Sequence, residues 1–329
     1  MPLAIDGITL PHAAILAPMS GVTDLPFRRA VRRAGGGLVV TEMIASAAVL
    51  RDVRSEMRKL RIEAIAEAPL SIQLAGCEPP VMAEAAKICA DLGASFIDIN
   101  MGCPAKKVTG KLSGSALMRD PNLAGAIMAE VTSAVDVPVT LKMRLGWDDD
   151  SLNAPEMARI AMDNGIKMLA VHGRTRCQMY NGSADWKKIA DVVQAVDLPV
   201  VANGDINALD DVQTALQDSG AAGVMIGRGA QGRPWLLGQA GDFIAGRTPR
   251  QDPSVCERHQ MMRAHLDDML SHYGSAGMRL ARKHIAWYAQ GLPGAAALRD
   301  CANNTNDAAI VFAAVDQFFE MLDPAAVVA

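Results

Sequence analysis

The chain has 329 residues, half of them apolar, and a formal net charge of −4 at pH 7. This length fits one large domain, or one large and one small domain, and the apolar content excludes wholesale disorder. Six scattered cysteines form no C-x-x-C pair, which argues against a zinc site, an iron–sulfur cluster or a disulfide framework. Without a signal-peptide pattern or an apolar run long enough for a membrane span, we expect a cytoplasmic protein with no metal and no membrane segment.

Short apolar segments alternate with amphipathic helical segments from residue 15 to about residue 230. The predicted strands are 15–18, 38–41, 70–74, 96–100, 137–142, 168–172, 198–203 and 223–227. The predicted helices between them include 26–33, 79–92, 121–135, 153–164, 186–196 and 208–219. Eight such units predict an α/β protein of the (β/α)8 TIM-barrel type. An open doubly wound sheet is the alternative, but no G-x-G-x-x-G motif follows the first strand.

The alternation stops after a closing helical segment at 234–245, and residues 246–253 have the composition of a linker. Helical patterns follow at about 254–273, 277–290, 294–302 and 306–321. We therefore expect a barrel domain at 1–245 and a small all-helical domain at 246–329. In the latter, Arg279, Arg282 and Lys283 are spaced to share one helix face, followed by Trp287 and Tyr288. A basic binding face and a merely solvated face are both compatible with this spacing.

The predicted strand ends carry polar and basic residues, which a barrel would gather at one mouth because its active site lies at the carboxyl ends of its strands. They are Pro18-Met19-Ser20, Glu42-Met43, Gln73, Asn100 with Cys103, Lys142-Met143-Arg144, His172-Gly173-Arg174, Asn203-Gly204-Asp205 and Gly227-Arg228. Structural polar residues alone would scatter over both ends of the barrel. The clustering therefore predicts an active site.

Cys103 follows Asn100 and Gly102 on a turn that Pro104 prevents from continuing as a helix. A buried structural cysteine is the plain alternative to a catalytic thiol. Lys142 is expected to face an anion or an electron-rich ring, or else to form a salt bridge with a carboxylate such as Glu42. His172 could serve the site or be a structural imidazole.

Two loops have the composition of anion-binding segments. The turns after the seventh and eighth strands carry glycines together with Arg228, which suits a phosphate group. The loop 105–111 carries Lys106, Lys107 and Lys111 beside Cys103, and we expect a flexible cationic loop for a polyanionic substrate. A solvated surface loop is the alternative for the lysines.

Taken together, these segments resemble the tRNA-dihydrouridine synthases, with the bacterial B type as the nearest branch. The resemblance rests on Ala17-Pro-Met-Ser-Gly-Val-Thr-Asp24, Asp98-Ile-Asn-Met-Gly-Cys-Pro-Ala-Lys-Lys-Val108, Leu141-Lys-Met-Arg144, His172-Gly-Arg-Thr-Arg176, Ala202-Asn-Gly-Asp-Ile206, Met225-Ile-Gly-Arg228, Gly232-Arg-Pro-Trp235 and Ala281-Arg-Lys-His-Ile-Ala-Trp-Tyr288. It covers about residues 10 to 290. Ser20 often stands as alanine in relatives, and the tail after residue 295 matches no family motif.

The resemblance implies an FMN-binding barrel, a helical tRNA-binding domain, NADPH as reductant and the reduction of D-loop uridine in tRNA. We expect a monomer. The implied FMN contacts are Pro18, Met19, Ser20, Gln73, Lys142, His172, Asn203, Gly204, Asp205, Gly227 and Arg228. Cys103 matches the family's proton donor and Asn100 its contact to the uracil. The further tRNA contacts that we expect are Lys106, Arg174, Arg279, Arg282 and Lys283.

The implied reaction adds a hydride from FMN N5 to uracil C6 and a proton from Cys103 to C5. A thiol in water titrates near pH 8.5, so it is mostly protonated at neutral pH and can act as an acid. Three alternatives stay open at this point. They are a flavin barrel acting on free pyrimidines like the dihydroorotate dehydrogenases, a Schiff-base aldolase built on Lys142, and a non-catalytic tRNA-binding factor.

Overall fold

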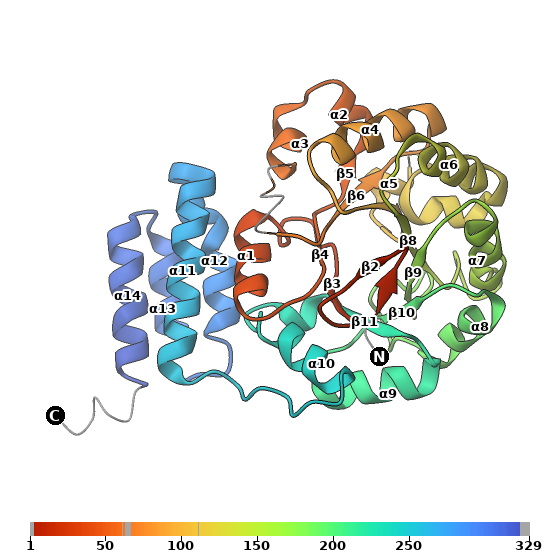
Figure 1. Cartoon of the computed structure of the whole chain (residues 1–329). Helices are drawn as coiled ribbons and strands as arrows, with labels where there is room; N and C mark the ends of the chain where they lie inside the picture. Colours follow the sequence, from red (N-terminus) through yellow and green to blue (C-terminus); the bar gives the residue numbers. More distant parts are fainter. Residues whose placement is uncertain (1–2, 61, 63–66, 111, 323–329) are drawn as a thin grey trace.

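The computed structural model describes residues 3–60, 62, 67–110 and 112–322. Its centre is a closed barrel of eight parallel strands, in which β4 pairs with β6 to close the ring (Figure 1). The barrel strands are β3 (Ala14–Leu16), β4 (Val39–Val40), β6 (Leu70–Ala75), β7 (Phe96–Met101), β8 (Val139–Arg144), β9 (Met168–His172), β10 (Val200–Asn203) and β11 (Gly223–Ile226). The TIM-barrel prediction is confirmed, and the open-sheet alternative is wrong.

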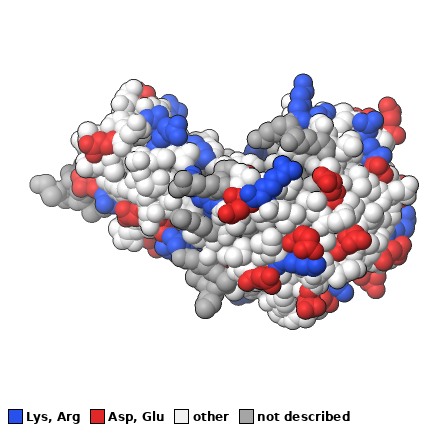
Figure 2. All heavy atoms as spheres, turned by 90° about the horizontal axis from the view of Figure 1, so that it is seen from above, with Lys and Arg blue, Asp and Glu red and all other residues white. Residues whose placement is uncertain are grey.

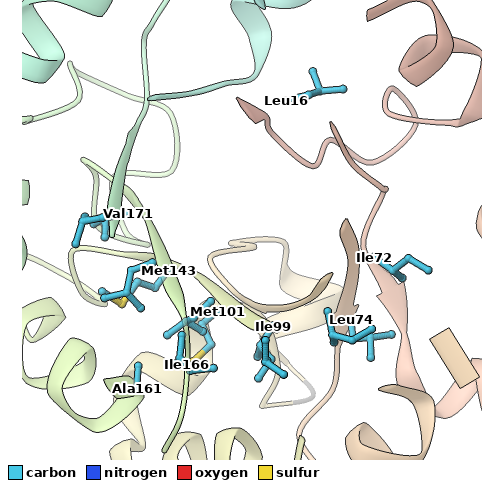
Figure 3. Packing of buried hydrophobic residues seen from close by; sticks show 14 of the residues in the cluster. Leu16, Ile72, Leu74, Ile99, Met101, Met143, Ala161, Ile166 and Val171 are labelled. Carbon is cyan, nitrogen blue, oxygen red and sulfur yellow. The ribbon is translucent and has the colours of Figure 1, made fainter. Parts of the chain in front are cut away.

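Side chains alternate along each strand between the helices outside and the barrel interior. Ile99, Met101 and Met143 point outward and join the large apolar cluster beneath the helices (Figure 3). Phe96 and Met168, the first residues of their strands, belong to a second apolar cluster inside the barrel. That cluster includes Leu3 and Ile5 from the hairpin of β1 (Ala4–Ile5) and β2 (Ile8–Thr9), which therefore closes the amino end.

The outer layer consists of helices that follow the strands in sequence. They are α1 (Leu25–Arg33), α4 (Pro79–Asp91), α6 (Pro121–Ala134), α7 (Ala154–Asp163), α8 (Lys187–Ala195), α9 (Leu209–Ser219) and α10 (Leu236–Ile244). Their boundaries follow local signals. Asp120 caps α6 by accepting from Leu123 N at 3.0 Å, and Gly220, with φ +64°, ends α9.

Six short elements lie in the loops at the mouth and were absent from the expected set. They are β5 (Ile44–Ala45), α2 (Ser46–Leu50), α3 (Arg54–Lys59), α5 (Lys106–Thr109) and the 3₁₀ helices η1 (Gly114–Arg119) and η2 (Arg228–Ala230). Each has at most six residues, which is too few for a 3.6-residue apolar period to stand out. In particular, four residues of the expected flexible loop after Cys103 are helical.

After α10 the chain forms a bundle of four helices, α11 (Val255–Tyr273), α12 (Gly277–Tyr288), α13 (Ala295–Asn304) and α14 (Ala308–Glu320). The predicted all-helical region is confirmed. Its apolar core includes Leu266, Ile285 and Phe318, and extends to Ala34 and Trp235 of the barrel part. The bundle therefore packs directly on the barrel, with α11 beside α1 (Figure 1).

Polar contacts add to this interface. Arg29 and Arg33 of α1 bind Asp268 of α11 at 2.9 and 2.6 Å, and Tyr273 donates to Asp24 at 2.7 Å. In the view of Figure 2 the outline is notched between bundle and barrel, and basic and acidic side chains are interspersed on this face. None of the helices in the described ranges is long and apolar enough to cross a membrane.

Candidate active site

A cavity of about 490 Å³ opens at the carboxyl ends of the barrel strands. Cavities that bind cofactors and drug-sized ligands typically have volumes of about 300–1,000 Å³. Every residue for which the resemblance implies an FMN contact lies on its wall, together with both residues expected at the uracil. Those residues are Pro18, Met19, Ser20, Gln73, Asn100, Cys103, Lys142, His172, Asn203, Gly204, Asp205, Gly227 and Arg228. The predicted convergence of strand ends is therefore confirmed, whereas the role of each residue stays a prediction.

Cys103 lies half-buried on a turn whose backbone is held from several sides. Its N–H donates to Asn100 Oδ1 at 3.0 Å. Its carbonyl accepts from the Ser115 N–H at 3.1 Å and from the Ser115 hydroxyl at 2.9 Å. Arg144 Nε donates to the carbonyl of Gly102 at 2.8 Å. These bonds fix the backbone that carries the thiol at the cavity wall.

Lys142 is buried at the end of β8, beside Asn100 in the neighbouring strand. Its ammonium donates to Asn203 Oδ1 at 2.9 Å, and Asn203 Nδ2 donates to the carbonyl of Met225 at 2.7 Å. Glu42, the carboxylate considered as its partner, instead accepts from the N–H of Gly21 at 2.5 Å. Burial and the charge of Arg144 lower the pKa of Lys142 to about 8. A buried lysine bound to a neutral amide can still attract an anionic group.

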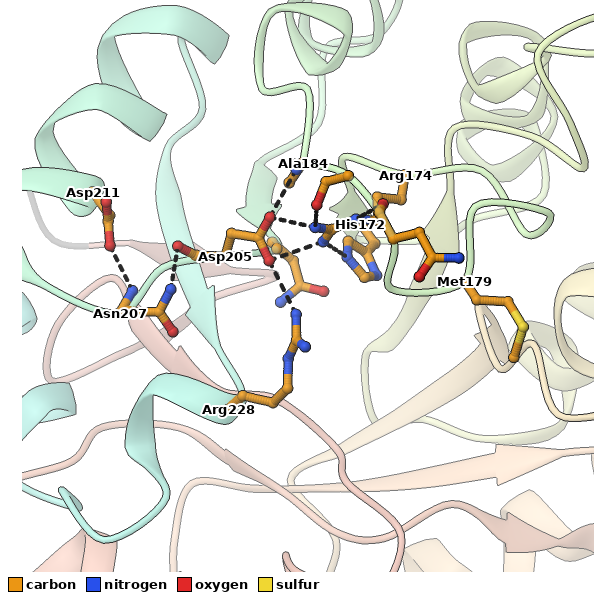
Figure 4. A network of polar contacts seen from close by, with 12 residues as sticks. His172, Arg174, Met179, Ala184, Asp205, Asn207, Asp211 and Arg228 are labelled. Carbon is orange, nitrogen blue, oxygen red and sulfur yellow. Dashed lines mark hydrogen bonds and ion pairs between the residues drawn. The ribbon is translucent and has the colours of Figure 1, made fainter. Parts of the chain in front are cut away.

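A charge network follows β9 and β10 on the other side of the cavity (Figure 4). Arg174 donates to both carboxylate oxygens of Asp205, at 2.9 and 2.5 Å, and Arg228 donates to Asp205 Oδ1 at 3.0 Å. Although partial burial opposes it, these contacts and the N–H of Ala184 lower the pKa of Asp205. Asp205 is therefore held as a carboxylate that aligns Arg228 at the rim.

His172 lies beside this network as a neutral imidazole. Burial and the positive charges of Lys142, Arg144 and Arg174 hold its pKa well below the ordinary value of 6.5. Arg174 approaches its Nε2 at 3.4 Å, so Nε2 is the acceptor. Gly204, with φ +114°, lies against the ring, where an added Cβ would be 2.7 Å from Cδ2. The structure therefore requires glycine at this position.

The expected tRNA contacts outside the cavity differ in exposure and in their bonds to the rest of the protein. Lys106 is exposed on α5, the side chain of Lys107 is outside the described set, and Lys111 is outside the described residues. Arg174 is buried and also donates to the carbonyls of Asn181 and Gly182, at 3.1 and 2.6 Å. Its geometry supports the loop after β9 rather than direct contact with a ligand.

The three basic residues of α12 share one side of the helix but differ in their partners. Arg279 is exposed. Arg282 donates to the carbonyl of Ala302 at 3.0 Å and to Asn306 Oδ1 at 3.0 Å. Lys283 donates to the carbonyl of Gly21, next to cavity residue Ser20. Arg282 and Lys283 therefore hold parts of the fold together, and a contact of this face with tRNA stays a prediction.

Sequence reasoning did not assign a role to three residues in or below the cavity. Arg144 lies two residues after Lys142 on the same strand, so the period of two along a strand could have found it. Tyr180 lies in the long loop after β9, with the guanidinium groups of Arg144 and Arg228 at 5.6 and 5.0 Å from its ring centre. Asp98 is fully buried beneath the cavity, two residues before Asn100. No sequence signal points to Tyr180.

Comparison with known proteins agrees with this geometry. The family model described as dihydrouridine synthase (Dus) matches residues 15–322. The chain is 52% identical over 320 residues to a probable tRNA-dihydrouridine synthase from Rhodobacter capsulatus, covering 97% of this chain and 98% of the relative. It is 48% identical over 318 residues to a probable tRNA-dihydrouridine synthase from Rickettsia conorii, covering 96% of each. It is 44% identical over 321 residues to tRNA-dihydrouridine synthase B from Xanthomonas campestris pv. campestris, covering 97% and 96%.

The strand ends of the barrel build one cavity, and the family model matches the chain over nearly its whole length. Together they define the protein as an oxidoreductase. The chain belongs to the dihydrouridine synthase family. The resemblance noted in the sequence is thereby confirmed.

Proposed function

We propose that this protein reduces the 5,6 double bond of D-loop uridine in tRNA, with FMN as bound cofactor and NADPH as reductant. The observation that carries the proposal is that Cys103, Asn100 and Lys142 open into one cavity of cofactor size in a member of this family. The relatives' names supply the substrate, since they are called tRNA-dihydrouridine synthases.

The cavity wall fits FMN in its chemistry. Apolar side chains of Ala17, Pro18 and Met19 offer a surface for the flat ring system, and Lys142 offers a cation for its pyrimidine edge. Arg228, half-exposed at the rim, offers a charged fork for a phosphate. Gly204 lets the chain after β10 approach His172 without a side chain in between. When bound, reduced FMN supplies the hydride for C6 of the uracil.

The protein's own groups would then position the base and deliver the proton. Asn100 has an amide hydrogen to offer a uracil carbonyl, since its other contacts hold Gln73 and the turn of Cys103. Cys103 would donate the thiol proton to C5. Lys142 would stabilise the negative charge of the reduced ring and Tyr180 would cover the mouth. The uridine must leave its stack to enter, which costs least in a loop.

The same geometry weighs against the three alternatives. A free-pyrimidine reductase leaves the exposed Arg279 of the helical bundle and the exposed Lys106 near Cys103 without a substrate to contact. An aldolase needs Lys142 free to attack a carbonyl, whereas its ammonium is bonded to Asn203. A non-catalytic binding factor has no physical need for a thiol whose backbone is fixed at the wall of a cavity.

The test is reconstitution with the full chain. Purified protein loaded with FMN is expected to be yellow, to oxidise NADPH, and to form dihydrouridine in tRNA isolated from cells that lack the enzyme. Position-resolved mapping of dihydrouridine in the product would identify the target uridines. Inability to bind FMN, or turnover of free uracil or uridine but not of tRNA, would contradict the proposal.

A further inference from the structure

A directional chain of hydrogen bonds runs from the turn of Cys103 to a carboxylate buried beneath the cavity. The N–H of Cys103 donates to Asn100 Oδ1 at 3.0 Å, and Asn100 Nδ2 donates to Gln73 Oε1 at 2.7 Å. Gln73 Nε2 donates to Asp98 Oδ2 at 2.7 Å, and the hydroxyl of Thr140 donates to Asp98 Oδ1 at 2.6 Å. The three links from Cys103 to Asp98 therefore all donate toward the carboxylate, and Thr140 donates to it from the opposite side.

The two ends of this chain determine the orientation of both amides between them. A backbone N–H can only donate, so the oxygen of Asn100 must face the turn. The carboxylate oxygen toward Gln73 accepts, so the nitrogen of Gln73 must face Asp98. Reversing either amide would bring two donors or two acceptors together inside the barrel, where an unmet polar group is costly.

This orientation survives protonation of the carboxylate. Burial raises the pKa of Asp98, while the bonds from Thr140 and Gln73 and the charge of Lys142 lower it. A proton on Asp98 would reside on the oxygen that faces Thr140, because that hydroxyl can rotate to accept. The oxygen that faces Gln73 stays an acceptor in both states.

The strand register explains why the chain is rigid. Gln73 of β6 pairs with Asp98 of β7, and Asp98 pairs with Thr140 of β8. Asp98 is 1% exposed and Gln73 is 1% exposed, so water does not compete for these bonds. Each amide uses one N–H hydrogen within the chain and keeps the second for a group in the cavity that both residues line.

We infer that Asp98 is a positioning residue of the active site, which acts through Gln73 and Asn100 to hold the turn of Cys103. It also orients the amide hydrogens that Gln73 and Asn100 present to the cavity, which suits carbonyl oxygens of a ring cofactor and of a uracil. The inference rests on the proposed function for what occupies the cavity, but the chain of hydrogen bonds does not depend on that function.

The experiment compares three variants of the full chain. Asp98→Leu removes the acceptor while keeping the branched shape of the side chain. Asp98→Asn keeps an acceptor for Gln73 and can direct its new N–H at Thr140. Thr140→Val is the matched control, because it removes the bond to the same carboxylate on the side that does not lead to the cavity.

Three readouts separate positioning from a merely structural role. The first is the alkylation rate of Cys103 in the protein without flavin or tRNA, resolved by peptide mass spectrometry. The second is the Kd for FMN, and the third is the division between kcat and KM for tRNA. We expect Asp98→Leu to accelerate alkylation at least about threefold, to raise the Kd for FMN about tenfold and to lower kcat about tenfold with KM unchanged.

Asp98→Asn is expected to stay within about threefold of the wild type in all three readouts, since it keeps a neutral acceptor. Thr140→Val should stay in the same range while its melting temperature falls. If Asp98→Leu does not fold, the test uses the double variant Asp98→Leu/Thr140→Val, with Thr140→Val as its reference. The double variant removes the hydroxyl of Thr140, which would otherwise lose its partner. Replacing both partners of a buried hydrogen bond by apolar side chains of similar shape can be nearly neutral for stability.

The inference is overturned if Asp98→Leu matches the wild type, if Thr140→Val is as damaging, or if Asp98→Asn is no better than Asp98→Leu. Failure of the proposed function would look different. In that case the wild type would bind no FMN or make no dihydrouridine, while the alkylation rates would still report on the chain.

Discussion

The cavity and the helical bundle use their polar residues in opposite ways. In the cavity, buried side chains form hydrogen bonds to one another along the wall, such as Lys142 to Asn203 or Asn100 to Gln73. In the bundle, Arg282 binds α13 and its following loop, and Lys283 binds the barrel, whereas Arg279 is exposed. The barrel therefore holds its site residues in fixed positions, whereas the basic residues of the bundle mainly fix where the bundle lies on the barrel.

The difference has a geometric origin. Parallel strands end at one face, so a residue's place in the register determines where its side chain points. A helix determines only the angle around its axis, and a long basic side chain can reach a neighbouring helix or loop. Each of the following predictions tests one side of this contrast.

The largest expected effect is that of Cys103→Ala. A general acid typically contributes about 10²–10⁴ in rate, so dihydrouridine formation should fall by about that factor. FMN content and NADPH oxidation should be unchanged, because the backbone clamp of residue 103 does not use the thiol. Cys256→Ala, at an exposed site on α11, is the control. Loss of flavin from Cys103→Ala would instead indicate a structural thiol.

The next effect concerns Lys142 and pH. Its pKa is lowered to about 8, so its positive charge is present below that pH and lost as the pH rises through it. Flavin reduction by NADPH should therefore slow when the pH rises past about 8 and the lysine loses its charge. A negatively charged reduced ring raises the pKa of the lysine, so the decline can begin above pH 8.

Lys142→Met should be slower by about 10²- to 10³-fold and should lack this alkaline decline, since removing one electrostatic contact to a developing negative charge costs about that much. Anaerobic stopped-flow measurement of the reductive half-reaction contains no proton transfer from Cys103 to substrate, because no uracil is present. An unchanged alkaline decline in Lys142→Met would assign the titration to another group.

These two predictions rest on residues that the sequence alone identified. Asn100, Cys103, Lys142 and His172 could be found because each lies near or just beyond the carboxyl end of a strand with a clear apolar pattern. Asp98 escaped notice because a carboxylate within an apolar strand has no partner that sequence can name. Tyr180 escaped because a loop has no period, and its place at the mouth depends on the tertiary packing of Arg144 and Arg228.

The bundle is tested by a matched pair on α12. Arg279→Gln should weaken tRNA binding about three- to tenfold and reduce the slope of log Kd against log salt by about one, without a change in melting temperature. Arg282→Gln should lower the melting temperature by a few degrees, because it releases Ala302 and Asn306, and should leave the salt slope unchanged. Equal salt slopes in both variants would show that α12 does not contact tRNA through Arg279.

The smallest effect is expected at the joint between barrel and bundle. Burial raises the pKa of Asp24 to about 6, although Tyr273 and the N–H of Phe27 donate to it. The folded protein therefore binds a proton more tightly than the unfolded chain, and the contribution of Asp24 to stability grows as the pH falls from about 6 toward 4.

Asp24→Asn keeps an oxygen for the cap of α1 and for Tyr273 but cannot titrate. Its melting temperature should exceed that of the wild type by a few degrees at pH 7, and the two should converge as the pH approaches 4. Asp120→Asn, the same replacement at the exposed cap of α6, subtracts the effect of the amide itself. A difference that grows toward acid pH would mean that Asp24 is stabilised as a carboxylate, and the joint would then be held by charge rather than by a neutral hydrogen bond.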